Sequence, residues 1–292
     1  MTPAIRIEDA LASAVRLLSE AEVLAPRLTA EVLLCHALGR ERSYLFGHPE
    51  ALLSEVVWIH FGRYVHQRLQ GKPTQYITRR QEFYGRDFAV GPAVLIPRPE
   101  TEHVVERVLA LAPTGRIADV GCGSGAIGVT LALELNRPVL LIDVSPSALA
   151  VAAANAARLG SNSPCLVGDL TTPLADGSLD LLVSNPPYIP IRDGPTLQRE
   201  VRDYEPHLAL FGGESGNEVY ARLVADAERV LRPGGWLVLE LGYDREADVR
   251  GLVKHWDEVQ VDPDLAGIPR VLSARWNAKK PPDRGETRGL ID

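Results

Sequence analysis

Asp119-Val120-Gly121-Cys122-Gly123-Ser124-Gly125-Ala126 decides the fold, because this stretch joins a predicted strand at Ile117–Val120 to a predicted helix near residues 126–135. Glycines at alternate positions let the backbone turn sharply and come close to a ligand. The N–H groups at the start of the helix would then face that ligand. A strand, a glycine loop and a helix in this order indicate an α/β domain with a cofactor site at the loop.

Strands and helices alternate along the rest of the chain from Arg116 onward. Several of the strands are continuous apolar runs, as expected where both faces of a sheet are covered. The predicted strands are Ile117–Val120, Val139–Asp143, Pro164–Val167, Leu179–Ser184, Trp236–Leu241, Val259–Val261 and Val271–Trp276, with helices near 126–135, 146–159, 218–231 and 245–255. This order predicts an α/β fold with a mostly parallel sheet between two helical layers.

The N-terminal part of the chain has helical periodicity instead. It predicts one helix through Ile7 and Leu18, a second from Pro26 to a stop at Gly39, and a third from about Ser54. Short β-rich runs then follow at Gln75–Tyr84 and Arg86–Val90, separated by Gly85, which suggests a hairpin. Pro92, Pro97 and Pro99 mark a stiff connector.

These patterns predict four segments. Residues 1–73 form a helical domain, 74–99 a β-hairpin and proline-rich linker, 100–277 the α/β domain, and 278–292 a tail without apolar periodicity that we expect to be mobile. The region before the linker is locally basic, which is typical either of a solvated face or of a docking surface. Its basic residues are Arg63, Arg68, Lys72, Arg79, Arg80 and Arg86.

Composition excludes several classes of protein. The 292 residues carry a net charge of −7, which argues against indiscriminate nucleic-acid binding, since Lys and Arg supply most of that affinity. Cys35, Cys122 and Cys165 form no CxxC pair and the histidines show no ligand spacing, so neither a disulfide framework nor a metal site is predicted. The chain shows no secretion signal and no apolar run long enough to span a membrane, so we expect a cytoplasmic protein.

A second motif, Asn185-Pro186-Pro187-Tyr188, follows the apolar strand Leu179–Ser184. The Asn185 side chain offers a carbonyl oxygen, and Pro186 offers a backbone carbonyl and no N–H of its own. Two such acceptors suit both N–H bonds of an amide or an exocyclic amine, and Tyr188 offers a ring to lie on the bound group. The alternative is a purely structural role, in which the motif is a proline-stiffened turn with a packed tyrosine.

The glycine loop is compatible with two cofactors. Gly123, Gly125 and Gly128 satisfy G-x-G-x-x-G and Asp143 lies about twenty residues on, as at a dinucleotide site. S-adenosylmethionine is the other candidate: Asp143 would hold its ribose diol, Asp169 its adenine amino group, and Leu170 would pack on the adenine ring. The second motif favours S-adenosylmethionine, because hydride transfer has no need of an amine-binding tetrapeptide. Asp119 either contacts the methionine amino group or bonds its own glycine loop.

Most of the chain resembles the release-factor glutamine methyltransferases of the PrmC/HemK type. The selective segments are Gly71–Ile77, Phe83–Gly85, Val94–Glu102, Tyr204–Pro206, Ala209–Gly213, Gly216 and Gly267–Val271, beside the glycine loop and the Asn-Pro-Pro-Tyr motif. The resemblance implies a Rossmann-like, seven-stranded S-adenosylmethionine-dependent methyltransferase domain behind a small helical domain that docks the substrate. Leu170 departs from some relatives, which carry a larger aromatic there.

The resemblance also implies an enzyme that methylates the amide nitrogen (N5) of the glutamine in the Gly-Gly-Gln motif of peptide chain release factors. Asn185, Pro186 and Tyr188 are the expected catalytic residues, with Pro187 and Arg98 added for substrate binding. The expected cofactor residues are Asp119, Gly121, Cys122, Gly123, Ser124, Gly125, Asp143, Asp169, Leu170 and Asn185. We expect a monomer whose partner is a release factor, without sequence-specific nucleic-acid or membrane binding.

Three rival functions share these motifs. A sister enzyme would methylate a glutamine of a ribosomal protein, with the same active site and different docking. An adenine-N6 DNA methyltransferase would bind an amine of the same geometry, but it would need a basic cleft to hold a flipped-out base. A dinucleotide-binding sensor would use the glycine loop without catalysis.

Overall fold

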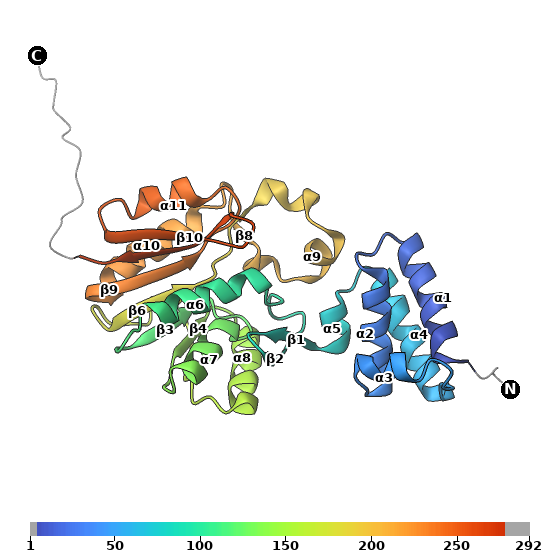
Figure 1. Ribbon diagram of the computed structural model, residues 1–292. Helices are drawn as coiled ribbons and strands as arrows, with labels where there is room; N and C mark the ends of the chain where they lie inside the picture. Colours follow the sequence, from blue (N-terminus) through green and yellow to red (C-terminus); the bar gives the residue numbers. More distant parts are fainter. Residues whose placement is uncertain (1–4, 278–292) are drawn as a thin grey trace, which may run out of the picture. The chain divides into compact units, whose positions relative to one another are not determined.

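The computed structural model describes residues 5–277, which form two compact units (Figure 1). The first unit contains the N-terminal residues through Gln81, together with Val90–Pro92 and Leu197–Glu205. The second unit contains Glu82–Ala89, Ala93–Thr196 and the described residues from Pro206 to Asn277. The predicted mobile tail, 278–292, lies outside the described residues.

The first unit is helical. Its helices are α1 (Ile7–Glu20), α2 (Pro26–Leu38), α3 (Arg42–Gly47), α4 (Glu55–Leu69), α5 (Thr74–Thr78) and α9 (Arg199–Tyr204). Leu18, Leu33 and Leu34 have no exposed surface and Phe61 is 1% exposed, and α1 to α5 share one apolar core. Pro26 begins α2 and Gly39 ends it in the left-handed conformation at φ 64°, which confirms the predicted start and stop of this helix.

Two features of the first unit differ from the sequence prediction. The run Gln75–Tyr84 is not one strand: Thr74–Thr78 forms α5, and only Arg80–Phe83 forms a strand, β1, paired with β2 (Arg86–Ala89). Tyr76 and Ile77 have β propensity, but burying both side chains at 3% and 5% exposure selects the helix. The second difference is Arg68, which is buried and forms an ion pair with Glu200 at 2.7 Å, so it is part of neither a solvated nor a docking face.

The second unit is built on a seven-stranded sheet in the order β10-β11-β9-β6-β3-β4-β5. The strands are β3 (Ile117–Val120), β4 (Leu140–Asp143), β5 (Cys165–Val167), β6 (Leu179–Ser184), β9 (Leu231–Glu240), β10 (Asp257–Pro263) and β11 (Pro269–Arg275). β3 to β6 and β9 pair in parallel, whereas β11 is antiparallel to both of its neighbours. The predicted mostly parallel sheet of an α/β fold is confirmed.

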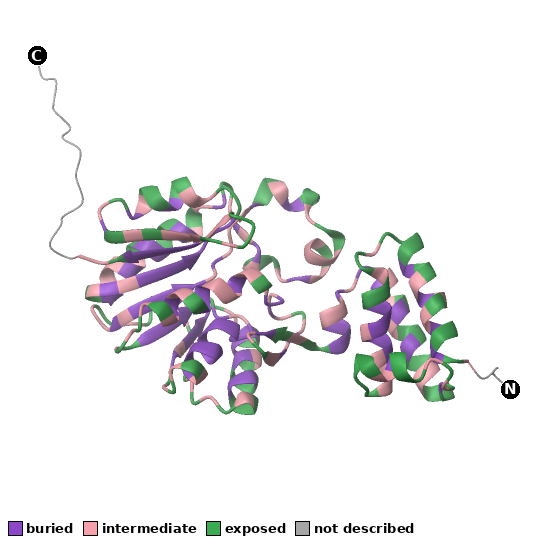
Figure 2. Ribbon diagram, viewed as in Figure 1, coloured by how far each residue is buried: buried purple, intermediate pink, exposed green. Residues whose placement is uncertain are grey.

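Helices cover both faces of this sheet, and alternate strand residues supply the two apolar layers (Figures 1 and 2). Leu181 and Val183 of β6 pack toward one layer, and Leu182 between them packs toward the other. The first layer contains α6 (Glu102–Ala110), α7 (Ala126–Glu134) and α8 (Pro146–Leu159); the second contains α10 (Glu218–Val230) and α11 (Glu246–Leu252). The central strands are therefore buried on both sides.

Short elements complete the second unit. They are the 3-10 helices η1 (Pro99–Thr101), η2 (Ile191–Thr196) and η3 (His207–Ala209), and the strands β7 (Ile189–Pro190) and β8 (Phe211–Gly213), which pair in parallel with each other. η1 leads directly into α6, and Glu100 and Glu102 lie in the first turns of these two helices.

Candidate functional site

The sheet order reverses direction at β3, because β4 and β5 lie on one side of it and β6 and β9 on the other. The loops that leave the carboxyl ends of these strands diverge at such a switch point and leave room for a ligand. The glycine loop follows β3, Asp143 ends β4, Gly168 follows β5 and Asn185 follows β6. The two motifs singled out in the sequence therefore leave neighbouring strands at the same edge of the sheet.

The glycine loop adopts a conformation that favours glycine at three alternate positions. Gly121, Gly123 and Gly125 have φ angles of 72°, 54° and 80°. The Gly121 and Cys122 N–H groups both donate to the Ile142 carbonyl, at 2.8 and 3.0 Å, so the loop is tied to β4. A Cβ added at Gly123 would meet no protein atom within 4 Å, because this residue faces open space.

Two carboxylates accept hydrogen bonds from backbone N–H groups of the glycine loop and of the helix that follows it. Asp143 accepts from the Gly123 N–H at 2.9 Å through Oδ2 and from the Ser145 N–H at 2.9 Å through Oδ1. Asp119 is 1% exposed and accepts from the Gly128 N–H at 2.8 Å through Oδ2. Its Oδ1 has no hydrogen-bond partner among the described residues. Burial, reinforced by the nearby Asp143, raises the pKa of Asp119 to about 7.

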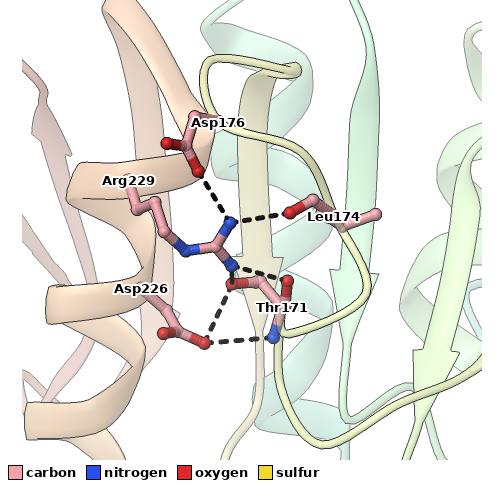
Figure 3. Close-up of polar contacts among 5 residues, drawn as sticks. All are labelled: Thr171, Leu174, Asp176, Asp226 and Arg229. Carbon is pink, nitrogen blue, oxygen red and sulfur yellow. Dashed lines mark hydrogen bonds and ion pairs between the residues drawn. The ribbon is translucent and has the colours of Figure 1, made fainter.

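The loop after β5 is held by a cluster on α10 (Figure 3). Asp226 accepts from both the N–H and the hydroxyl of Thr171, at 3.1 and 2.9 Å. Arg229 donates to the carbonyls of Thr171 and Leu174, at 2.8 and 2.7 Å, and to Asp176. This bracing holds the preceding residue, Leu170, in the left-handed region at φ 51°, which is uncommon for a residue with a branched side chain.

Asp169, the predicted partner of an adenine amino group, has a protein partner in the structure. The Arg222 Nη2 of α10 lies 2.6 Å from the Asp169 Oδ2, and both side chains are about half exposed. No local sequence pattern predicts Arg222, because it lies 53 residues further along the chain and belongs to no recognisable motif. A carboxylate oxygen can accept more than one hydrogen bond, so Asp169 retains acceptor capacity beside this ion pair.

The Asn185 side chain has a defined orientation. Its Nδ2 donates to the Thr101 Oγ1 at 3.2 Å, and within residues 5–277 its Oδ1 accepts no hydrogen bond. Tyr188 does not lie beside Asn185 on the cavity wall. Its ring packs against Gly242, where an added Cβ would come within 2.5 Å of the Tyr188 Cδ2, and burial raises the pKa of its hydroxyl.

A cavity of about 210 Å³ joins these segments. Of the predicted site residues, it is lined by Gly121, Cys122, Gly123, Ser124, Asp143, Asp169, Leu170, Asn185 and Pro187. Asp119, Gly125, Arg98, Pro186 and Tyr188 are not among the lining residues. Thr101, Ala93, Val94, Leu95, Leu208 and Arg222 line the cavity without having been predicted. Five of these six lie in or beside segments that carried the family resemblance; Arg222 had no such signal.

Two negative observations belong to the described part of the chain. Between residues 5 and 277, no three His, Cys, Asp or Glu side chains gather closely enough to bind a metal ion. No helix in the same range combines the length and the apolarity that a membrane crossing requires.

Known proteins resemble both parts of the chain. The family model described as the PrmC N-terminal domain matches residues 9–78, and that described as the Methyltransferase small domain matches residues 100–202. A crystal structure of a methyltransferase from Pyrococcus furiosus matches with a TM-score of 0.51 at 20% identity, over 66% of this chain and 90% of that one. This structural likeness supports the methyltransferase fold.

Curated relatives match over nearly the whole chain. The release factor glutamine methyltransferase of Koribacter versatilis is 46% identical over 274 residues, which cover 92% of this chain and 98% of the relative. The protein of the same name from Bacillus subtilis is 40% identical over 258 residues, covering 84% of this chain and 90% of the relative. With an α/β domain whose sheet is covered by helices on both faces, and with a glycine loop and an Asn-Pro-Pro-Tyr motif at one cavity, the chain belongs to the release factor glutamine methyltransferase family.

Proposed function

We propose that this chain is an S-adenosylmethionine-dependent enzyme that methylates the N5 amide nitrogen of the glutamine in the Gly-Gly-Gln motif of peptide chain release factors. One observation carries the proposal: Asn185 lines the same cavity as the glycine loop, and its side-chain nitrogen is already bonded to Thr101. Its carbonyl oxygen therefore remains available for the NH₂ group of a substrate amide.

The residues around the cavity fit S-adenosylmethionine. Gly123 faces open space at the wall, so the backbone there can approach a ligand without a side chain in between. Asp143, which ends β4, would hold the ribose diol, and Asp169 and Leu170 would receive the adenine. Asp119 Oδ1 has no hydrogen-bond partner among the described residues, so it would be available as an acceptor for the methionine ammonium. When bound, the cofactor supplies a methyl carbon on a positively charged sulfur.

The protein would act mainly by orientation. A carboxamide nitrogen is a poor nucleophile, because its lone pair is delocalised into the carbonyl group. Asn185 Oδ1 and the Pro186 carbonyl would accept the two N–H bonds of the glutamine amide, fix its plane and favour positive charge developing on nitrogen. Positioning of this kind supplies up to about 7–11 kcal/mol in well-aligned reactions. Tyr188 would support the motif through its packing on Gly242, and Arg98 would bind substrate near the entrance.

The test of the reaction is tandem mass spectrometry of a purified release factor after incubation with the enzyme and S-adenosylmethionine. The expected result is a mass gain of one CH₂ group on the glutamine of the Gly-Gly-Gln motif. Asn185→Ala should abolish most of the turnover, while calorimetry shows nearly unchanged cofactor binding. Modification of a ribosomal protein or of DNA in place of the release factor would overturn the proposal; the names of the curated relatives favour neither alternative.

We propose further that the domain of residues 1–73 docks the release factor, as one functional segment beside the linker at 74–99 and the catalytic domain at 100–277. Leu52, Val56 and Ile59 support this, because they expose 60–64% of their surface along α4 and the segment before it. On the opposite side of α4, Phe61 and Val65 fill the core of the helical unit. Adjacent exposed apolar side chains are typical of a surface that meets another protein.

Ile59→Ser tests the docking surface. We expect the KM for the release factor to rise about 5- to 10-fold, since the substitution removes apolar area that docking would bury, while cofactor affinity stays the same. Leu265→Ser is the matched control, because Leu265 is fully exposed in the turn between β10 and β11. Equal KM values for the two variants would exclude Ile59 from the interface.

The remaining features of the proposal concern assembly and location. We propose a monomer that works in the cytoplasm, where release factors act, and that makes no sequence-specific contact with nucleic acid. The net charge of −7 supports the last point. Light scattering across a concentration series measures the mass of the particle, and a low-salt gel shift with duplex DNA measures binding of nucleic acid.

A further inference from the structure

Buried polar side chains link Asn185, which follows β6, to Glu240 at the end of the neighbouring strand β9. Asn185 Nδ2 donates to the Thr101 hydroxyl at 3.2 Å. The Thr101 side chain in turn lowers the pKa of the buried Glu240 carboxyl. Thr101 is 4% exposed and Glu240 is 2% exposed. The reaction proposed above uses neither residue, yet burying a carboxyl group costs free energy unless something compensates for it.

The sheet explains why these three residues meet. β6 and β9 are parallel neighbours with Ser184 opposite Leu239, so the next residues, Asn185 and Glu240, leave the two strands at the same level. Thr101 approaches them from η1, where its N–H is fixed by the Arg98 carbonyl at 3.1 Å. The contact is therefore set by strand register on one side and by a helical turn on the other.

Because the Thr101 hydroxyl has a single proton, the hydrogen bonds through it can donate in only one direction at a time. The hydroxyl oxygen accepts from Asn185 Nδ2, so its proton is available to the Glu240 carboxylate. If Glu240 is protonated instead, its own O–H can donate to Thr101, and the Thr101 proton is then free to donate to Asn185. Asn185 can then turn its Oδ1 toward Thr101 as readily as its Nδ2. In the turned orientation it presents an NH₂ group to the NH₂ group of the substrate, and neither of the two can accept a hydrogen bond.

We infer that Thr101 and ionised Glu240 are positioning residues, which hold the Asn185 side-chain amide with Oδ1 available to the substrate nitrogen; this inference rests on the proposed function. Neither residue touches the reacting atoms. Their effect passes through the orientation of Asn185, so it would appear in turnover and in its pH dependence, and not in cofactor binding.

The surroundings of Glu240 place its ionisation in an accessible pH range. Burial raises the pKa of Glu240 to about 7, although the hydrogen bond from Thr101 opposes the shift. The charged and titratable groups that act on it are Arg270 of β11, Arg98 and Glu100 beside and in η1, Tyr188 of the substrate motif and Tyr220 of α10. Arg270 and Arg98 lower its pKa, and Glu100 raises it. Oε2 has no hydrogen-bond partner among the described residues.

Thr101→Val and Thr101→Ser test the orientation. Valine has nearly the shape of threonine but neither accepts from Asn185 nor donates to Glu240, so we expect the rate of release-factor methylation to fall about 5- to 10-fold at pH 8. Serine restores the hydroxyl and should recover most of this loss. The dissociation constant for S-adenosylmethionine, measured by calorimetry, should stay within about 2-fold in both variants. Equal losses in the two variants, or none in Thr101→Val, would overturn the inference.

The pH profile tests the role of the Glu240 charge. S-adenosylmethionine is kept saturating and the release factor well below saturation, so that the rate reports ionisation of the enzyme–cofactor complex. In that complex the cofactor ammonium would keep Asp119, whose own pKa is about 7, ionised. With a Glu240 pKa of about 7, the wild-type rate should be about 10-fold lower at pH 6 than at pH 8. Glu240→Gln removes the titrating group and should flatten this interval. Glu258→Gln is the matched control, because Glu258 is an exposed partner of Arg275, and it should keep the wild-type profile.

Release-factor methylation and the positioning role of Thr101 and Glu240 can be refuted independently. If the wild-type enzyme leaves the release factor unmodified, the proposed function fails. If the wild type methylates it and Glu240→Gln retains the wild-type pH dependence, the proposed function stands and the positioning role of Thr101 and Glu240 is refuted.

Discussion

Asp119→Asn should change how the stability of the α/β unit depends on pH. Asp119 is 1% exposed, and only one of its carboxylate oxygens has a hydrogen-bond partner among the described residues, the Gly128 N–H. Burial raises its pKa from 3.8 to about 7, with the neighbouring Asp143 acting in the same direction and the Gly128 N–H against it. Asparagine retains a side-chain carbonyl for Gly128 but cannot ionise.

The direction in which stability changes with pH follows from the folded and unfolded pKa values of Asp119. Between pH 4 and pH 7 the folded protein keeps a proton on Asp119 that the unfolded chain has lost, so the stability due to this group falls as the pH rises. It is complete below the unfolded pKa of 3.8 and is lost as the pH passes through the folded value of about 7. From pH 5 to pH 8, the free energy of unfolding of the wild type should fall by about 2–3 kcal/mol relative to the variant.

The change with pH is a cleaner measure than the absolute stability. The asparagine of the variant would bury an NH₂ group where Asp119 Oδ1 has no partner among the described residues, which costs about 1–3 kcal/mol at every pH. Glu240, whose pKa is also about 7, titrates in both proteins, so its contribution cancels in the difference.

Urea unfolding without cofactor at pH 5, 6, 7 and 8 measures the effect. Tryptophan fluorescence reports mainly on the α/β unit, since Trp236, Trp256 and Trp276 belong to it and only Trp58 to the helical unit. The difference in unfolding free energy between wild type and variant should change by the stated amount across this range. Parallel curves would show that Asp119 keeps the same charge in the folded and unfolded chains, and would refute the reasoning.

Four further substitutions probe the support of the site. Gly128→Ala would place a Cβ 2.3 Å from Leu141 Cδ2 and 2.9 Å from Asp119 Cβ, so we expect the free energy of unfolding in urea to fall by about 1–3 kcal/mol. In Gly123→Ala the added Cβ meets no atom within 4 Å, so this variant should lose stability only through the positive φ of that position. Asn155→Ala removes side-chain bonds to Ala89 and to the Ser124 carbonyl of the glycine loop, and should cost about 2–4 kcal/mol and weaken cofactor binding in calorimetry. Arg229→Met frees the loop that holds Leu170 (Figure 3) and should raise the cofactor Kd about 3- to 10-fold with kcat at saturation unchanged; an unchanged Kd would show that the loop does not need the brace.

Local sequence was informative wherever local chemistry controls the structure. Apolar runs located the central strands, because consecutive residues such as Leu181 and Leu182 are buried on opposite faces of the sheet and are therefore both apolar. Pro26 and Gly39 marked the ends of α2 through their own backbone preferences. The three glycines of the cofactor loop were recognisable for the same reason, since each occupies a positive φ.

Local preference failed where packing outweighs it. Tyr76, Ile77 and Thr78 favour a strand when taken alone, yet burial within the helical unit makes them part of α5. β9 begins at Leu231, five residues before the predicted start at Trp236, because Leu231 pairs with Leu179 of β6. A strand boundary depends on the length of its partner, and the partner lies far away in the sequence.

The site divides in the same way. Asn185 and the glycine loop could be found from the sequence, because each carries its chemistry within a few adjacent residues. Asn185–Thr101 and Asp169–Arg222 are contacts across 84 and 53 residues, and no local pattern contains either pair. The sequence determined which groups are available for chemistry. Only the tertiary structure decided which of them meet and which way the Asn185 amide faces, because the register of β6 and β9 and the approach of η1 arise when the sheet is assembled.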